Sequence, residues 1–216
     1  RGGAEMCVSD VNADGLNDVV TSLQAHVFGL AWFEQKREAG QISFVQHMIS
    51  DNFATKNAGN VVFSEPHAST FADMDGDGIP DFIVGKRYFS HNESYTDPDP
   101  YGAPVVYVYR TVRNKQAPGG AEFVPELVHN QSGVGSQILA VDLNKDGAMD
   151  LVTAGEWGAF AFLGKPRPKK KAGRLLLRRV VPDPAQHVGE DRTAVRIRVG
   201  AIAPHVLQLI ARAGRF

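Results

Sequence analysis

The chain has 216 residues, 43 % of them hydrophobic, with a formal net charge of −1 and one cysteine. It is long and apolar enough to bury a core, and Cys7, being alone, excludes an internal disulfide. The sequence shows neither a signal peptide nor a membrane-spanning run. The near-neutral total conceals an asymmetry: residues 1–164 hold 10 Lys and Arg against 21 Asp and Glu (net −11), whereas residues 165–216 hold 13 against 3 (net +10).

The first predicted elements surround an acidic segment, SDVNADGLNDVV at 9–20. It places a carboxylate or amide at positions 1, 3, 5 and 9 of a short loop, with a glycine at position 6. The residues that follow are β-rich: DVVTSL at 18–23, GLAWFEQ at 29–35 and ISFVQHMI at 42–49. This part of the chain is therefore predicted to be a loop that leads into successive strands.

The same order of elements recurs twice, with the loops starting 63 and then 69 residues apart. ADMDGDGIPDFIVG at 72–85 leads to PVVYVYR and EFVPELVH, and VDLNKDGAMDLV at 141–152 leads to GAFAFLG at 158–164. A short apolar approach, such as ASTFAD or SQILAVD, precedes the loop. Each unit thus has about four strands, which is the composition of a β-propeller blade. The predicted fold class is all-β, with about three four-stranded propeller blades.

The spacing of the acids points to calcium. Four carboxylates in one short loop repel one another, and a hard cation that accepts six to eight oxygen ligands relieves that repulsion. An EF-hand loop begins in the same way but needs an acid at position 12, followed by a helix. Position 12 is here Thr21, Val84 or Thr153, and a strand follows, so the EF-hand interpretation fails.

These motifs resemble the FG-GAP or VCBS repeat family, whose D-x-[DN]-x-D-G-x-x-D loops bind calcium at the blade turns of β-propellers. The resemblance covers residues 1–164 and implies side-chain ligands in each loop: Asp10, Asn12, Asp14 and Asp18; Asp73, Asp75, Asp77 and Asp81; Asp142, Asn144, Asp146 and Asp150. A backbone carbonyl at position 7 can complete each site, from Leu16, Ile79 and Ala148. The second loop, with four carboxylates, is expected to bind most tightly.

The repeat number departs from that family. Propellers have about four to eight blades, whereas this chain offers about three, so the remaining blades are expected to lie outside it. Three blades alone would expose sheet faces and edges.

The basic tail, 165–216, supports three interpretations. It is a patch for nucleic acid or anionic lipid, a linker with a small strand (TAVRIRV) and a short helix (HVLQLIARA), or a segment foreign to the propeller. The change in composition favours the last, and nucleic acid is not an expected partner.

The longest interruption of the second unit, residues 85–104, supplies the candidate ligand-binding residues. These are Lys86, Arg87, Tyr88 and His91, together with His67 just upstream. A cation pair beside tyrosines suits an acidic sugar or a proton transfer, although a solvated structural loop is the simpler interpretation. The aromatic residues of GLAWFEQ and WGAFAF are expected to be buried between blades, with stacking on a glycan as the alternative.

The sequence therefore favours a calcium-stabilised binding module of a secreted or cell-surface protein, which recognises a glycan or a protein. Loops of this kind fill readily where calcium is millimolar, outside the cytosol. The alternative is part of a propeller enzyme that acts on carbohydrate, because some polysaccharide lyases and a sugar dehydratase are similar in using such loops. A third hypothesis is that this piece has no independent activity.

Overall fold

The computed structural model describes residues 3–52, 57–89, 97–166 and 195–196. They form an all-β structure of three antiparallel sheets, each with its strands in chain order. The first sheet holds β1 (Met6–Ser9), β2 (Asp18–Ser22), β3 (Leu30–Glu38) and β4 (Gln41–Ser50). The second holds β5 (Pro66–Ala72), β6 (Asp81–Lys86), β7 (Val106–Arg113) and β8 (Ala121–His129). The third holds β9 (Ile138–Val141), β10 (Asp150–Gly155), β11 (Gly158–Phe162) and β12 (Val195–Arg196).

Two short 3₁₀ helices, η1 (Ala58–Asn60) and η2 (Pro118–Gly120), complete the described secondary structure. The prediction of an all-β chain with three four-stranded units is confirmed at the level of these sheets, none of which closes on itself within the described residues. Across the described part of the chain, there is no helix with the length and apolar character needed to cross a membrane.

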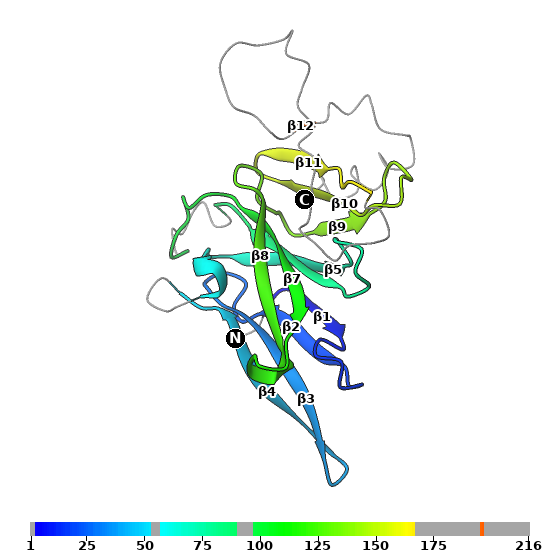
Figure 1. The fold of residues 1–216 in the computed structure, drawn as a ribbon. Coiled ribbons are helices and arrows are strands. Elements are labelled where there is room, and N and C mark those ends of the chain that lie inside the picture. Colours follow the sequence, from blue (N-terminus) through cyan, green and yellow to red (C-terminus); the bar gives the residue numbers. More distant parts are fainter. Residues whose placement is uncertain (1–2, 53–56, 90–96, 167–194, 197–216) are drawn as a thin grey trace.

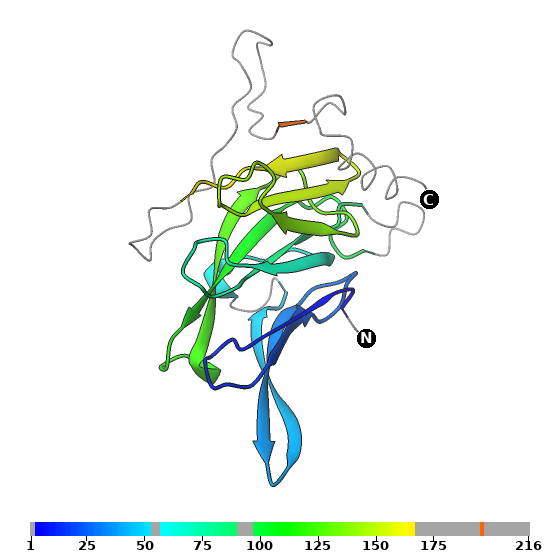
Figure 2. The ribbon, with the colours of Figure 1, turned by 90° about the vertical axis from the view of Figure 1, so that its right-hand side faces the viewer.

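The three sheets follow one another through the molecule, with the second between the other two (Figures 1 and 2). One apolar core joins the first sheet to the second, and it includes Val20, Trp32 and Tyr109. A second core joins the second sheet to the third, and it includes Val108, Leu151 and Phe160. The first strands of the sheets are neighbours, because β5 contacts both β1 and β9.

Strand β6, in the middle sheet, has a continuous run of apolar residues because both of its faces are covered. Phe82 and Val84 belong to the core shared with the first sheet, whereas Ile83 belongs to the core shared with the third. All six residues of β6 are buried. A strand covered on both faces needs apolar side chains at successive positions, which is the pattern of DFIVG.

The β3–β4 hairpin extends away from the rest of the molecule (Figure 2). Its turn is tight, because Glu38 pairs with Gln41 and only Ala39 and Gly40 lie between them, with φ values of 48° and 81°. Positive φ at both central residues is the geometry of a type I′ turn, whose twist matches that of the strands.

Within the described residues, the basic tail includes 165–166, which follow the third sheet, and the short strand β12. Val195 and Arg196 pair with Ala161 and Phe160 of β11, and both belong to the predicted strand TAVRIRV. The predicted helix HVLQLIARA lies outside the described residues.

Candidate metal sites and ligand surface

The three acidic loops share one backbone conformation and lie on the same side of the molecule, the right-hand side of Figure 1. Positions 4 and 6 have positive φ in every loop: Ala13 (65°) and Gly15 (86°), Gly76 (76°) and Gly78 (88°), Lys145 (59°) and Gly147 (86°). A side chain at the position-6 glycine would meet no atom within 4 Å, so the left-handed backbone, and not lack of space, calls for glycine there.

The first aspartate of each loop accepts hydrogen bonds from the backbone of the turn. Asp10 accepts from the N–H groups of Asp14 (3.2 Å) and Gly15 (3.1 Å), and Asp142 accepts in the same way from Asp146 (3.1 Å) and Gly147 (3.0 Å). Asp73 accepts from Gly76, Asp77 and Gly78 at 2.7 to 3.1 Å. These bonds hold the turn in place from within.

The ninth position has a different role, because Asp18, Asp81 and Asp150 are buried. One oxygen of each accepts the N–H of loop position 2: Val11 (2.9 Å), Met74 (3.0 Å) and Leu143 (2.8 Å). The other oxygen accepts an N–H from the third strand of the sheet or just after it: Gln35 (2.9 Å), Thr111 (3.1 Å) and Gly164 (2.8 Å). Each of these carboxylates therefore fixes its loop to the sheet that follows.

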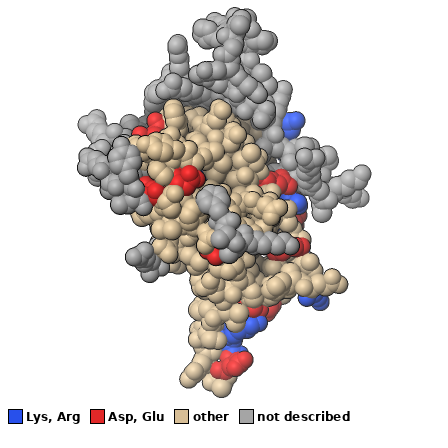
Figure 3. Space-filling model, turned by 90° about the vertical axis from the view of Figure 1, so that its left-hand side faces the viewer, with Lys and Arg blue, Asp and Glu red and all other residues tan. Residues whose placement is uncertain are grey.

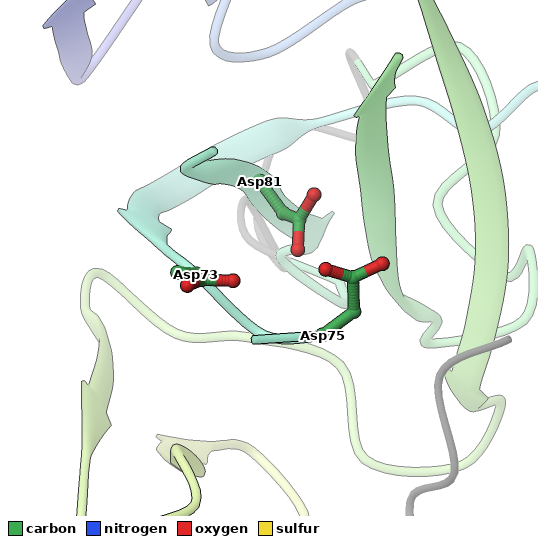
Figure 4. Close-up of side chains that lie close together, drawn as sticks. All are labelled: Asp73, Asp75 and Asp81. Carbon is green, nitrogen blue, oxygen red and sulfur yellow. The ribbon is translucent and has the colours of Figure 1, made fainter. Parts of the chain in front are cut away.

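The second loop is the one that brings carboxylates together (Figure 4). Asp73, Asp75 and Asp81 each direct an oxygen into one shared space, and these oxygens lie within 4.8 Å of one another. In the described part of the chain, no other three His, Cys, Asp or Glu side chains approach so closely. This donor set is all oxygen, which fits a hard divalent cation. Asp77, the fourth predicted ligand, is exposed at the rim and accepts the N–H of Ile79 at 2.8 Å.

The first and third loops differ because an asparagine replaces the second acid. The amide nitrogen of Asn12 donates to Asp14 Oδ2 (3.3 Å), and that of Asn144 donates to Asp146 Oδ2 (2.9 Å). An amide donor therefore occupies the place where loop two has a second negative charge. The fit to a cation is accordingly best in loop two, whereas Asp10, Asn12, Asp14, Asp18, Asp142, Asn144, Asp146 and Asp150 stay predicted ligands, as do the carbonyls of Leu16, Ile79 and Ala148.

The charge in loop two has an electrostatic consequence. Burial raises the pKa of Asp81 to about 7, the charges of Asp75 and Asp77 add to the rise, and the N–H groups of Thr111 and Met74 oppose it. Burial likewise raises the pKa of Asp18 in loop one. Asp75 has a partial counter-charge in Arg110, whose Nη1 lies 4.0 Å from Asp75 Oδ2, but Arg110 is also bound to Glu126 at 2.6 Å.

Comparison with known proteins adds no name to this arrangement. The chain matches no protein-family model, and no curated protein matches it. The resemblance of the loops to FG-GAP or VCBS repeats therefore rests on the loop residues themselves.

Lys86, a predicted ligand-binding residue, is fully buried at the end of β6. Its Nζ donates to Ser64 Oγ (2.5 Å) and to the carbonyl of Asp99 (2.6 Å), and it lies 3.6 Å from Glu65 Oε1. Burial lowers the pKa of Lys86, and the negative charge of Glu65 acts against that effect. This position gives Lys86 a structural role inside the sheet and keeps it away from a ligand in solvent.

The other predicted ligand residues are separated. Arg87 Nη1 lies 3.2 Å from His67 Nε2, so these two form a half-buried pair. Tyr88 points instead towards Trp157, with ring centroids 5.4 Å apart. His91 lies outside the described residues.

Tyr88 is a candidate ligand residue from the sequence, but the sequence does not predict that it belongs to a strip of aromatic side chains. Trp157 is 51 % exposed, so the expectation that WGAFAF buries all its aromatic residues is wrong for this residue, although Phe160 and Phe162 are buried. Trp157 contacts Tyr88, Tyr88 contacts Phe89 (6.2 Å), and Phe89 stacks on Tyr101 (5.2 Å), which is 65 % exposed. The signal was the turn itself: Gly155 pairs with Gly158, which leaves Trp157 in a two-residue hairpin loop, where side chains face solvent.

Charged groups are scattered over the described residues on the face that Figure 3 shows. On the face in Figure 3 most of the visible surface is uncharged, and the acidic side chains form small separate groups. A surface that binds nucleic acid needs a continuous area of lysine and arginine to neutralise phosphates. The described residues show no such area on this view.

Proposed function

We propose that this chain is a calcium-stabilised binding module built from three β-propeller blades of the FG-GAP or VCBS type. The loop geometry carries the proposal: one backbone conformation occurs three times, each time between the first and second strands of a four-stranded sheet. The contacts of β5 with β1 and β9 support the blade assignment, because first strands are neighbours around a propeller axis. We place the module outside the cytosol, at the cell surface or in a secreted protein, because calcium is millimolar there and would fill such loops.

Thermal melting of the full chain tests this function. A cation that binds only the folded state adds about 2.7 kcal/mol at a hundredfold excess over its Kd, which is roughly 5 to 11 °C in Tm for a chain of this size. We expect such a rise in millimolar calcium relative to chelator, and a smaller one in magnesium, which demands a regular octahedral site. Equal melting in calcium and chelator would make the loops plain Asp-Gly turns.

The ligand surface of the module is proposed to be the aromatic strip of Tyr88, Phe89, Tyr101 and Trp157, with a glycan as ligand. Exposed Trp and Tyr combine a large apolar face with a polar edge, which suits rings that carry both C–H and hydroxyl groups. The carbohydrate-enzyme alternative loses Lys86 as a base, because that side chain is buried.

Binding is tested by glycan-array screening followed by fluorescence titration of the ligand found. Trp157→Ala is expected to weaken binding at least about tenfold, since exposed aromatic anchors contribute most of the energy at such surfaces. The matched control is Phe44→Ala, which removes an exposed aromatic side chain from β4, away from the strip. Loss of binding in both variants, or in neither, would contradict the assignment of the strip.

A further inference from the structure

The three sheets can be compared position by position, because their first two strands pair in the same register. The residue four places before the first loop aspartate pairs with the residue at loop position 12: Met6 with Thr21, Ser69 with Val84, and Ile138 with Thr153. Equivalent residues therefore face equivalent directions in each sheet, and their burial shows which face of a sheet is covered.

The first sheet has one uncovered face. Met6 and Val8 are 69 % and 60 % exposed. The residues at the same places in the other sheets are covered by the preceding sheet: Phe71 packs against the first core, and Ile138 and Ala140 belong to or pack against the second. In the first sheet this face has no described neighbour, and apolar side chains lie open on it.

The third sheet is uncovered on the opposite face. Leu139, Val141 and Leu143 are 42 %, 41 % and 37 % exposed. Their counterparts are covered by the sheet that follows: Cys7 and Val11 at the first core, and Ala72 and Met74 at the second. A leucine at loop position 2 is thus exposed in the one sheet that no described sheet follows.

These two faces are of the two kinds that pack on each other between consecutive sheets of this chain. The face of Leu139 and Leu143 corresponds to the one that the first and second sheets turn towards their successors. The face of Met6 and Val8 corresponds to the one that the second and third sheets turn towards their predecessors. We infer that a second copy of this chain covers both faces, with its first sheet on the third sheet of its partner and its third sheet on the first.

The packing between consecutive sheets, which forms the joints inside the chain, indicates that the partner on the two exposed faces is a second copy. At both internal joints a sheet of this chain packs its successor-side face on the predecessor-side face of the next sheet, so the chain already combines these two kinds of face twice. Two copies make two identical joints related by a two-fold axis, and the total of six sheets falls within the four to eight blades of a propeller. A head-to-tail joint closes into a ring when the rotation fits, which makes a dimer the expected product. The inference rests on sheet packing and does not depend on calcium or on a glycan.

The mass of the full chain in solution is the first test. Sedimentation equilibrium in millimolar calcium is expected to give twice the chain mass of 23.4 kDa. A monomer at tens of micromolar would overturn the inference, and a series of larger species would overturn the closed ring.

Variants then test the geometry. Val8→Lys and Leu139→Lys each place a charge in both joints of a homodimer, and each is expected to raise the dissociation constant at least roughly 100-fold. Ile42→Lys, at an exposed position of the β3–β4 hairpin, is the matched control and should leave the dimer intact. Far-ultraviolet circular dichroism and melting confirm that each variant is folded, and Val141→Lys replaces Leu139→Lys where it is not.

Mixing distinguishes head-to-tail contact from face-to-itself contact. The Val8→Lys copy keeps its third-sheet face and the Leu139→Lys copy keeps its first-sheet face, so the mixture retains one intact joint. A mixed dimer should form from two variants that are each monomeric alone. If Val8→Lys abolishes the dimer and Leu139→Lys does not, the first sheet packs on the first sheet of the partner. If neither variant abolishes the dimer, the contact lies elsewhere. Either result overturns the inference.

Discussion

Asp75→Asn converts loop two into the version found in loops one and three, where position 3 is Asn12 or Asn144. The substitution keeps the oxygen that accepts the N–H of Asp77 at 3.1 Å and replaces the other oxygen with an amide donor. In loops one and three that donor binds the position-5 carboxylate. We therefore expect Asp75→Asn to have opposite effects on stability with and without calcium.

The size of the effect without calcium follows from the charges around Asp75. The three clustered oxygens of Asp73, Asp75 and Asp81 lie within 4.8 Å of one another, and at an effective dielectric constant of about 20 two charges at that limit repel by about 3.5 kcal/mol. Asp73 contributes that repulsion in full, and Asp81 contributes about half of it near pH 7, because its pKa is about 7. The two repulsions add to roughly 5 kcal/mol. The attraction between Asp75 and Arg110, 4.0 Å apart, offsets about 4 kcal/mol of this. The calcium-free variant should therefore gain about 1 kcal/mol, or roughly 2 to 4 °C in Tm.

The effect with calcium has the other sign but is smaller. Removal of one carboxylate ligand lowers the charge of the site, and a tenfold loss of affinity removes about 1.4 kcal/mol of stabilisation. Because the gain of about 1 kcal/mol in the calcium-free loop remains, the net loss in calcium is about 0.4 kcal/mol. Differential scanning calorimetry in chelator and in millimolar calcium measures both effects on the same protein. Glu38→Gln, at the exposed end of β3, is the control for charge removal alone. A lower Tm for Asp75→Asn in chelator would refute the view that loop two stores repulsion.

Three further predictions concern other parts of the described chain. Burial raises the pKa of Cys7 to about 11, so alkylation of the native thiol at pH 8 should be about 100-fold slower than in the unfolded chain, as iodoacetamide kinetics will show. Lys86→Met removes the ammonium group beside the buried Glu65 and should cost about 3 to 5 kcal/mol in urea unfolding, and Lys86→Met with Glu65→Gln should recover much of it. Gly147→Ala, at a φ of 86° with open space around it, should cost about 1 to 2 kcal/mol for backbone reasons alone. A cost within error of zero would show that the loop relaxes.

Much of the fold was accessible from the sequence, because its signals are local. Acidic loops, alternating strands and turn residues mark each unit, and the strands after the loops lie where β2, β6 and β10 are found. What the sequence could not supply is the pairing of faces between sheets, since Phe82 and Ile83 look alike in sequence and enter different cores.

The candidate site was less accessible, for a physical reason. The ninth aspartate of each loop looks in sequence like a ligand alone, but it also ties the loop to a distant strand, as Asp81 does by accepting the N–H of Thr111, 30 residues away in the chain. Lys86 looks like part of a ligand loop until Glu65 and Ser64 are placed beside its ammonium group. Roles that depend on distant partners and on burial carry no local pattern.

The three loops also form an internal comparison within one molecule. Their backbones agree although their charges differ, and in each loop the first and ninth aspartates accept the same hydrogen bonds from backbone N–H groups. The turn is thus shaped by glycine and by carboxylate–amide bonds, which need no cation. What distinguishes loop two is the gathering of Asp73, Asp75 and Asp81, with no amide to separate them. In the proposed function, calcium therefore acts on the stability of a loop that is already formed, and it acts most strongly where the acids are closest.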